Sequence, residues 1–162
     1  MGCDLHSHVE VRKDDGWQEV TDLDWGRDSG PFEARSYGVY GWLAGVRNYS
    51  AVGPVEEPRG FPDDASVTVR EDFEEWGWDG HTPSWFLVSE LLAVDYAAAV
   101  NDRRVTRQLA PNHWDGGVTG EPEEGEIQPL REFLGPHFMN HLDALAALGD
   151  PAKTRVVFWF DN

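Results

Sequence analysis

The run that ends the chain constrains the fold most. Residues 155–160 read Arg-Val-Val-Phe-Trp-Phe, so β-branched and aromatic side chains follow one another without polar alternation. Strands that are buried on both faces have this composition, whereas strands with one face in water alternate apolar and polar residues. The run therefore predicts a central strand of a sheet, buried on both of its faces.

The start of the chain predicts a second strand, with one polar face. Between Cys3 and Arg12, apolar or small residues alternate with charged residues and histidines, which is the period of a strand. Asp14-Asp15-Gly16 then supplies a turn, and Trp17–Val20 can return antiparallel to the first strand. We therefore expect an N-terminal β-hairpin.

Four later segments have helical features, and the last of them is the clearest. These segments are about residues 35–46, 66–76, 89–100 and 130–148, with Ser66 and Ser89 as N-caps. Segments rich in glycine, proline and acidic residues predict long loops at 21–34, 53–62 and 112–125. The expected fold is α+β in one domain, 1–162: a small mixed or antiparallel sheet with an N-terminal hairpin and a buried C-terminal strand, packed by about three to four helices.

Charge limits the partners of the chain. Its 162 residues include 30 Asp and Glu against 13 Lys and Arg, a formal charge of −17, which repels phosphate backbones and anionic lipid surfaces. We expect no nucleic-acid polymer and no membrane partner, although a few converging arginines can still bind one small anion. Cys3 is the only cysteine, so internal disulfides and cysteine-based zinc sites are excluded, and a cytoplasmic location is expected.

The polar face of the first strand is the first candidate site. Side chains two residues apart lie about 7 Å from each other on one face of a strand, so the row can supply metal ligands or acid and base groups. The row consists of Asp4, His6, His8 and Glu10, and further ligands would come from His81 first and then from Asp79, His113 and Asp161. The alternatives are a solvent-facing hairpin surface and a metal-free ligand site.

Two arginines and three tryptophans form further candidates. Arg47, followed by Asn48, and Arg59 could clamp a phosphate or carboxylate, or could instead pair with nearby acidic residues. Aromatic rings at Trp76, Trp78 and Trp85 could stack on a planar ligand, although tryptophans more often belong to the core. His137 and His141 have the i, i+4 spacing of metal ligands, but they lie among apolar helix positions, which favours core or partner-facing roles.

The sequence as a whole resembles a family of small, largely uncharacterised proteins encoded by tailed phages and by bacteria, often in prophage regions. The resemblance spans nearly the whole chain and implies an infected or lysogenic bacterial cell as the location. It is carried by the opening residues 1–6 with Glu10, by 43–48, by 58–64, by 79–81 with Ser84 and Trp85, and by the ending 156–162. The recurring polar positions of the family correspond to Asp4, His6, Glu10, Arg47, Asn48, Arg59, Asp64 and His81, which favours His6 over His8.

Three functions follow from these residues. The leading hypothesis is a phage-type protein that binds a small phosphorylated or nucleotide-like molecule, and one version sequesters a host immune signal. Its ligand-binding residues would be Arg47, Asn48, Arg59, His81 and Trp85.

The first alternative is a divalent-metal-dependent hydrolase of a phosphodiester-type small molecule. One metal ion would be held by Asp4, His6 and His81, and Glu10 would be the general base. The second alternative is an acidic protein inhibitor of a host factor. Any of the three could form a homo-oligomer, and whether the protein is an enzyme stays open.

Overall fold

A four-stranded antiparallel sheet forms the centre of the protein. The computed structural model describes residues 2–119, 121 and 123–162, without the side chains of 106–109, 113–115 and 118. The strands lie in the order β2-β1-β8-β3 and are β1 (Leu5–Lys13), β2 (Gly16–Val20), β3 (His81–Leu87) and β8 (Thr154–Phe160). Every residue of β8 is buried, and β1 and β2 pair as a hairpin. Both strand predictions made from the ends of the chain are confirmed.

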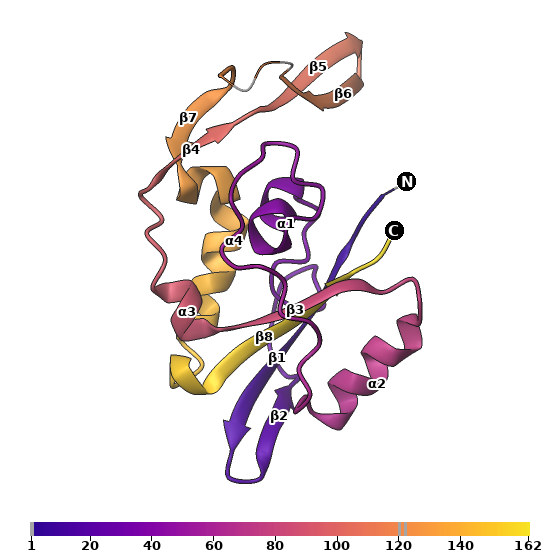
Figure 1. Ribbon diagram of the computed structural model, residues 1–162, viewed down its shortest axis with the longest axis vertical. Coiled ribbons are helices and arrows are strands. Elements are labelled where there is room, and N and C mark those ends of the chain that lie inside the picture. Colours follow the sequence, from indigo (N-terminus) through magenta and orange to yellow (C-terminus); the bar gives the residue numbers. More distant parts are fainter. Residues whose placement is uncertain (1, 120, 122) are drawn as a thin grey trace.

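Helices cover both faces of this sheet (Figure 1). The α-helices are α1 (Tyr37–Ala44), α2 (Val67–Trp76), α3 (Val88–Leu92) and α4 (Leu130–Ala146), and a short 3-10 turn spans Pro151–Lys153. One core contains the side chains of α1, α3 and α4 together with Leu5, Phe158 and Phe160. A smaller core on the opposite face contains Val157, Trp159 and the apolar side of α2. The expected α+β fold is confirmed.

The first strand is longer than its hairpin partner. Val20 at the end of β2 pairs with Val9, so the earlier residues of β1 have no β2 neighbour. The loop that follows β2 covers this edge instead, and the backbone N–H of Ser7 donates to the Glu33 carboxylate at 3.0 Å. The edge of β1 beside this loop is therefore one wall of a pocket.

Two further strand pairs extend beyond the central sheet (Figure 1). They are β4 (Ala99–Asp102) with β7 (Glu126–Pro129), and β5 (Arg104–Ala110) with β6 (His113–Val118). The helix predicted over 89–100 is therefore wrong beyond Leu92, because backbone groups of Tyr96 and Ala98 bond to the start of α4 instead. The predicted loop 112–125 contains β6, and its residues 120 and 122 lie outside the described part.

Glycines in α1 allow close packing. A Cβ at Gly41 would lie 2.7 Å from Oδ1 of Asn48, and a Cβ at Gly38 would collide with the guanidinium of Arg104. Ser36 caps the helix by accepting the N–H of Val39. The glycines that weaken the helix therefore bring Asn48 and Arg104 against it. No described helix is long and apolar enough to cross a bilayer.

Candidate functional site

Glu10 lies in a buried ion pair. Arg155 Nε donates to Oε1 of Glu10 at 2.8 Å, and the N–H of Ser66 donates to Oε2 at 2.6 Å. Glu10 is 0% and Arg155 2% exposed, and the guanidinium also reaches Asp64 at 2.9 Å. This environment is that of a structural ion pair, because a general base must reach a substrate or a water molecule.

Arg59 and Trp85 pack together beside β3. Arg59 donates to both carboxylate oxygens of Glu90, at 2.8 and 2.7 Å, and its guanidinium lies 4.8 Å from the ring centre of Trp85. The Glu90 carboxylate raises the pKa of Arg59. The geometry is that of a formed ion pair, so a ligand at Arg59 would have to compete with Glu90.

Arg47 and Asn48 lie elsewhere. Arg47 donates to Oδ1 of Asn162 at 3.3 Å, and a hydrogen bond with Tyr49 raises its pKa. The amide of Asn48 donates to the carbonyl of Val52 at 2.7 Å and accepts its N–H at 3.1 Å. Asn48 thus closes a local turn, and Arg47 and Arg59 share no contact residue in the described part of the chain.

The two ends of the chain run side by side and gather several predicted residues. The N–H of Asp4 donates to Oδ1 of Asp161 at 3.0 Å, and Nε2 of His6 lies 3.1 Å from Oδ2 of Asp161. The Asp4 carboxylate accepts from Nε and Nη2 of Arg35, at 2.8 and 2.6 Å, and this bond lowers the pKa of Asp4. Asp161, expected only as an additional ligand, is therefore the partner of His6.

His81 lies apart from that pair. Its ring lies 6.1 Å from the ring of Phe160, Nδ1 lies 2.9 Å from Oγ1 of Thr82, and Nε2 is buried with no partner among the described residues. Within the same part of the chain, the ligand atoms of Asp4, His6 and His81 do not form a group with metal-site distances. Asp79 is exposed, and the side chain of His113 lies outside the described residues.

The three tryptophans expected to surround His81 lie in different parts of the structure. Trp76 packs on His6, with ring centres 4.1 Å apart. Trp85 lies beside Arg59, and Trp78 is 92% exposed. The three rings therefore do not form a common stacking site.

Among the described residues, one group has ligand atoms close enough together to bind one metal ion. Its members are Asp28, His137 and His141, whose ligand atoms lie within 4.8 Å of one another. Nε2 of His137 lies 2.8 Å from Asp28, while Nδ1 of His141 accepts the N–H of Phe32 at 2.9 Å. Because that bond uses the lone pair of the neutral imidazole, the proton of His141 is on Nε2. A metal ion at His141 would therefore compete with Phe32.

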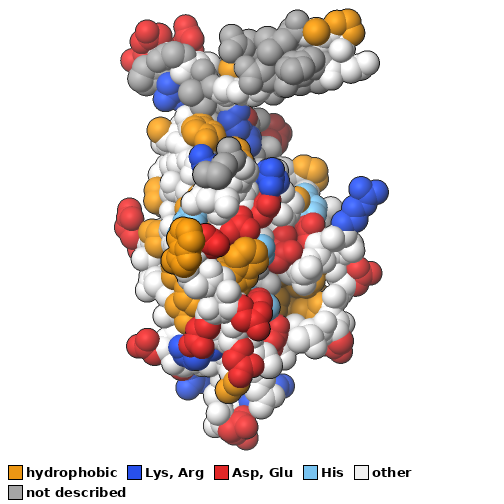
Figure 2. Space-filling view, turned by 90° about the vertical axis from the view of Figure 1, so that its right-hand side faces the viewer, with side chains coloured by type: hydrophobic (Ala, Val, Ile, Leu, Met, Phe, Trp, Pro, Cys, Tyr) orange, Lys and Arg blue, Asp and Glu red, His pale blue; other side chains and the backbone are white. Residues whose placement is uncertain are grey.

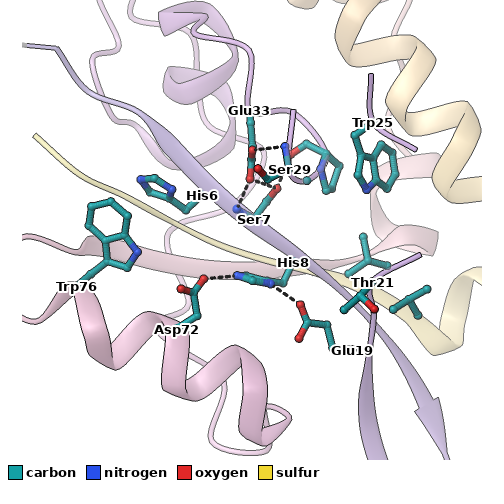
Figure 3. A pocket seen from close by; sticks show the side chains of 14 residues that line it. His6, Ser7, His8, Glu19, Thr21, Trp25, Ser29, Glu33, Asp72 and Trp76 are labelled. Atoms are coloured by element: carbon teal, nitrogen blue, oxygen red, sulfur yellow. Dashed lines mark hydrogen bonds and ion pairs between the residues drawn. The ribbon is translucent and has the colours of Figure 1, made fainter. Parts of the chain in front are cut away.

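A pocket of about 290 Å³ opens between β1, the end of β2, the following loop and α2 (Figure 3). We call it the histidine pocket, and its polar lining includes His6, His8, Glu19, Glu33 and Asp72. His8 lies between two carboxylates, with Nδ1 2.7 Å from Glu19 and Nε2 2.6 Å from Asp72. No Lys or Arg is among the described lining residues, so the lining favours uncharged or cationic molecules.

A second pocket, of about 710 Å³, lies between the start of α1 and the β5–β6 hairpin. We call it the arginine–tyrosine pocket. Its described lining residues are Arg35, Ser36, Tyr37, Tyr49, Arg104, Val105, Gly116 and Gly117. Its lining has two guanidinium groups and two phenol rings, whereas the lining of the histidine pocket has histidines and carboxylates.

Each arginine of this pocket is oriented by one aspartate. Asp102 accepts from Nε and Nη2 of Arg104, both at 2.9 Å, and Nη2 also donates to the carbonyl of Phe133. Burial alone would raise the pKa of Asp102, but its hydrogen bonds from Arg104 outweigh burial and lower it. The Asp4 carboxylate likewise accepts hydrogen bonds from Nε and Nη2 of Arg35. Among the described residues, Nη1 of Arg35 and Nη1 of Arg104 make no such carboxylate contact, and Nη1 of Arg104 lies against Gly38 of α1.

Sequence reasoning missed Arg35 and Arg104. Arg35 lies at the start of a predicted helix, and Arg104 lies much later in a segment without a clear pattern. The signal that could have singled out Arg104 is the adjacent pair Arg103-Arg104 in so acidic a chain. Their meeting depends on long-range packing, since Arg104 lies against α1 only because residue 38 is glycine.

Comparisons of the chain with models of known protein families, with curated proteins and with solved structures found no match.

Proposed function

We propose that the protein binds a small phosphorylated or nucleotide-like molecule in the arginine–tyrosine pocket. The observation that carries the proposal is the pair of guanidinium groups, Arg35 and Arg104, beside two phenol rings in a pocket of about 710 Å³. The volume is in the range of small-molecule sites. In a chain of charge −17, such a concentration of cationic donors suits an anionic ligand.

The free donors fit a phosphate group. Nη1 of each arginine can donate to a phosphate oxygen while the aspartates keep the guanidinium planes fixed. The first turn of α1, capped by Ser36, adds the positive end of a helix dipole. A phosphate between the two arginines would therefore meet fixed donors from two elements.

The tyrosines fit a planar group. Tyr37 and Tyr49 lie with ring centres 5.8 Å apart, nearly perpendicular, and Tyr49 is 46% exposed. A base or another flat ring can stack on the open face of Tyr49. Arg47, expected from the sequence to bind the ligand, does not line this pocket, but it forms a hydrogen bond with Tyr49, which does.

The surface charge agrees with a small ligand rather than a polymer. Acidic side chains cover much of the face shown in Figure 2, while several basic side chains lie in its upper part, below the segment drawn in grey. A long polyanion would meet the acidic area, whereas a small anion can enter the local cationic site. For a phage-type protein, sequestration of a host nucleotide signal is the biological version of this proposal.

Native mass spectrometry of the freshly purified protein tests the proposal. We expect a co-purified mass of a nucleotide or another phosphorylated compound in the wild type. The mass should be lost in Arg35→Gln but retained in Arg27→Gln, which removes the same charge from an exposed position away from the pocket. Equal retention in both variants would contradict the proposed site.

A further inference from the structure

His6 of the histidine pocket forms with Asp161 a second arrangement that has chemistry of its own. Asp161 is fixed by the backbone, because its Oδ1 accepts the N–H of Asp4 at 3.0 Å. Its other oxygen lies 3.1 Å from Nε2 of His6. An ionised carboxylate only accepts hydrogen bonds, so the proton of a neutral His6 belongs on Nε2 and the lone pair on Nδ1.

Two tryptophans hold the His6 ring in place. The ring of Trp76 lies 4.1 Å away at 34°, and that of Trp159, which is 0% exposed, lies 6.2 Å away. The His6 side chain is 26% exposed and lines the pocket (Figure 3). A carboxylate that fixes the tautomer and packing that fixes the ring are the conditions under which histidine acts as a general base.

We propose that His6, positioned by Asp161, is the general base of a metal-free hydrolytic site for small uncharged or cationic esters. Nδ1 takes a proton from water while the water oxygen bonds to the acyl carbon. The bond from that carbon to the alcohol oxygen then breaks, and the departing oxygen takes the proton back from Nδ1. The products are a carboxylic acid and an alcohol, and no metal or other co-reactant is required.

The remaining lining determines which esters enter. Glu33 already accepts the N–H groups of Ser7 and Ser29, at 3.0 and 2.9 Å, so it forms a fixed acidic wall. Glu19 and Asp72 both face the ring of His8. Since carboxylates outnumber cationic groups here, an ester with its own carboxylate is disfavoured relative to an uncharged one.

Hydrolysis of 4-nitrophenyl acetate by the full-length protein tests this site, with mono-4-nitrophenyl succinate as the anionic probe. His6→Ala should lose about 100-fold in kcat/KM or more, and added imidazole, which the 290 Å³ pocket can admit, should restore part of the rate. The control His137→Ala removes an exposed histidine of α4 and should leave the rate and the imidazole response unchanged. The succinate ester should react more slowly than the acetate in the wild type.

The positioning role of Asp161 is tested by kcat and KM measured separately, because a merely structural role would not change kcat alone. Asp161→Asn should lower kcat with little change in KM, and Asp161→Glu should recover part of kcat, while circular dichroism confirms that both variants are folded. Equal rates in wild type and His6→Ala, or no turnover of the acetate above the buffer rate, would overturn the proposal. Loss of rate in His6→Ala that imidazole does not restore would also overturn it.

Discussion

Removal of one partner from the Glu10–Arg155 ion pair should strongly destabilise the protein. Both side chains are almost completely buried, and breaking such a pair costs about 3–5 kcal/mol because the remaining charge stays in a site with little water. Arg155→Met should lie at the upper end of this range, since it leaves Glu10 with only the Ser66 N–H. Glu10→Gln should lie at the lower end, because Arg155 keeps Asp64.

The double variant is the sharper part of this prediction. Glu10→Gln with Arg155→Met leaves no buried charge, and the introduced glutamine side chain still offers an acceptor to the Ser66 N–H. Replacement of both members of a buried ion pair by uncharged side chains often changes the free energy of unfolding only little. The double variant should therefore be more stable than the sum of the two single losses predicts, by about 2 kcal/mol or more.

Urea unfolding followed by tryptophan fluorescence measures all three variants. Trp17, one of the eight tryptophans of the chain, lies 4.1 Å from the Arg155 guanidinium, so the signal includes a contribution from the site. A loss of about 3–5 kcal/mol corresponds to roughly 6–20 °C in Tm for a chain of this size. Additive losses, or single losses below about 1 kcal/mol, would refute the assignment of Glu10 and Arg155 as a buried structural pair.

Two further predictions concern single side chains. Burial lowers the pKa of His141, so the folded state binds fewer protons than the unfolded state, and the free energy of unfolding should fall as pH drops below about 6.5. In urea unfolding between about pH 5 and 8, His141→Gln should make this pH dependence flatter. The same pH dependence in wild type and variant would contradict this prediction. A change from glycine to alanine usually stabilises a helix interior by about 1 kcal/mol. In Gly38→Ala, however, the new Cβ displaces Arg104, so both the stability of the protein and its affinity for anions should fall. A gain in stability with unchanged anion affinity would show that Arg104 does not need its contact with Gly38.

The parts of the fold that were predictable depend on local pattern. The alternation of residues 3–12 and the apolar run at 155–160 each specify a strand without reference to the rest of the chain. β3 gives no such signal, because Pro83 and Ser84 interrupt it and a register shift lies between His81 and Ser84. Its pairing with β8 is decided by tertiary packing, as is the replacement of a longer helix by a turn after Leu92.

The candidate sites were predictable only in part. His6 follows from strand alternation, and Asp161 is among the further metal ligands expected for the row of residues that contains His6; its direct contact with His6 is seen only in the structure. Arg35 has no local signal, and the Arg103-Arg104 pair marks Arg104 only as a local basic pair, because Arg35 and Arg104 come together only through long-range packing. Residue type and spacing suggested Arg59 equally well, but its pair with Glu90 uses both Nη1 and Nη2, whereas the carboxylate pairs of Arg35 and Arg104 use Nε and Nη2.

Calorimetric titration of ADP tests the central claim most directly. The wild type should bind ADP. The Kd for ADP should be about 10–100-fold higher in Arg35→Gln, because this variant loses one charge-assisted contact, which contributes about 1.5–3 kcal/mol. Arg27→Gln should bind like the wild type, and higher salt should weaken binding in both. If the wild type binds neither ADP nor inorganic phosphate, or if Arg35→Gln and Arg27→Gln bind ADP equally well, the arginine–tyrosine pocket is not a site for phosphorylated ligands.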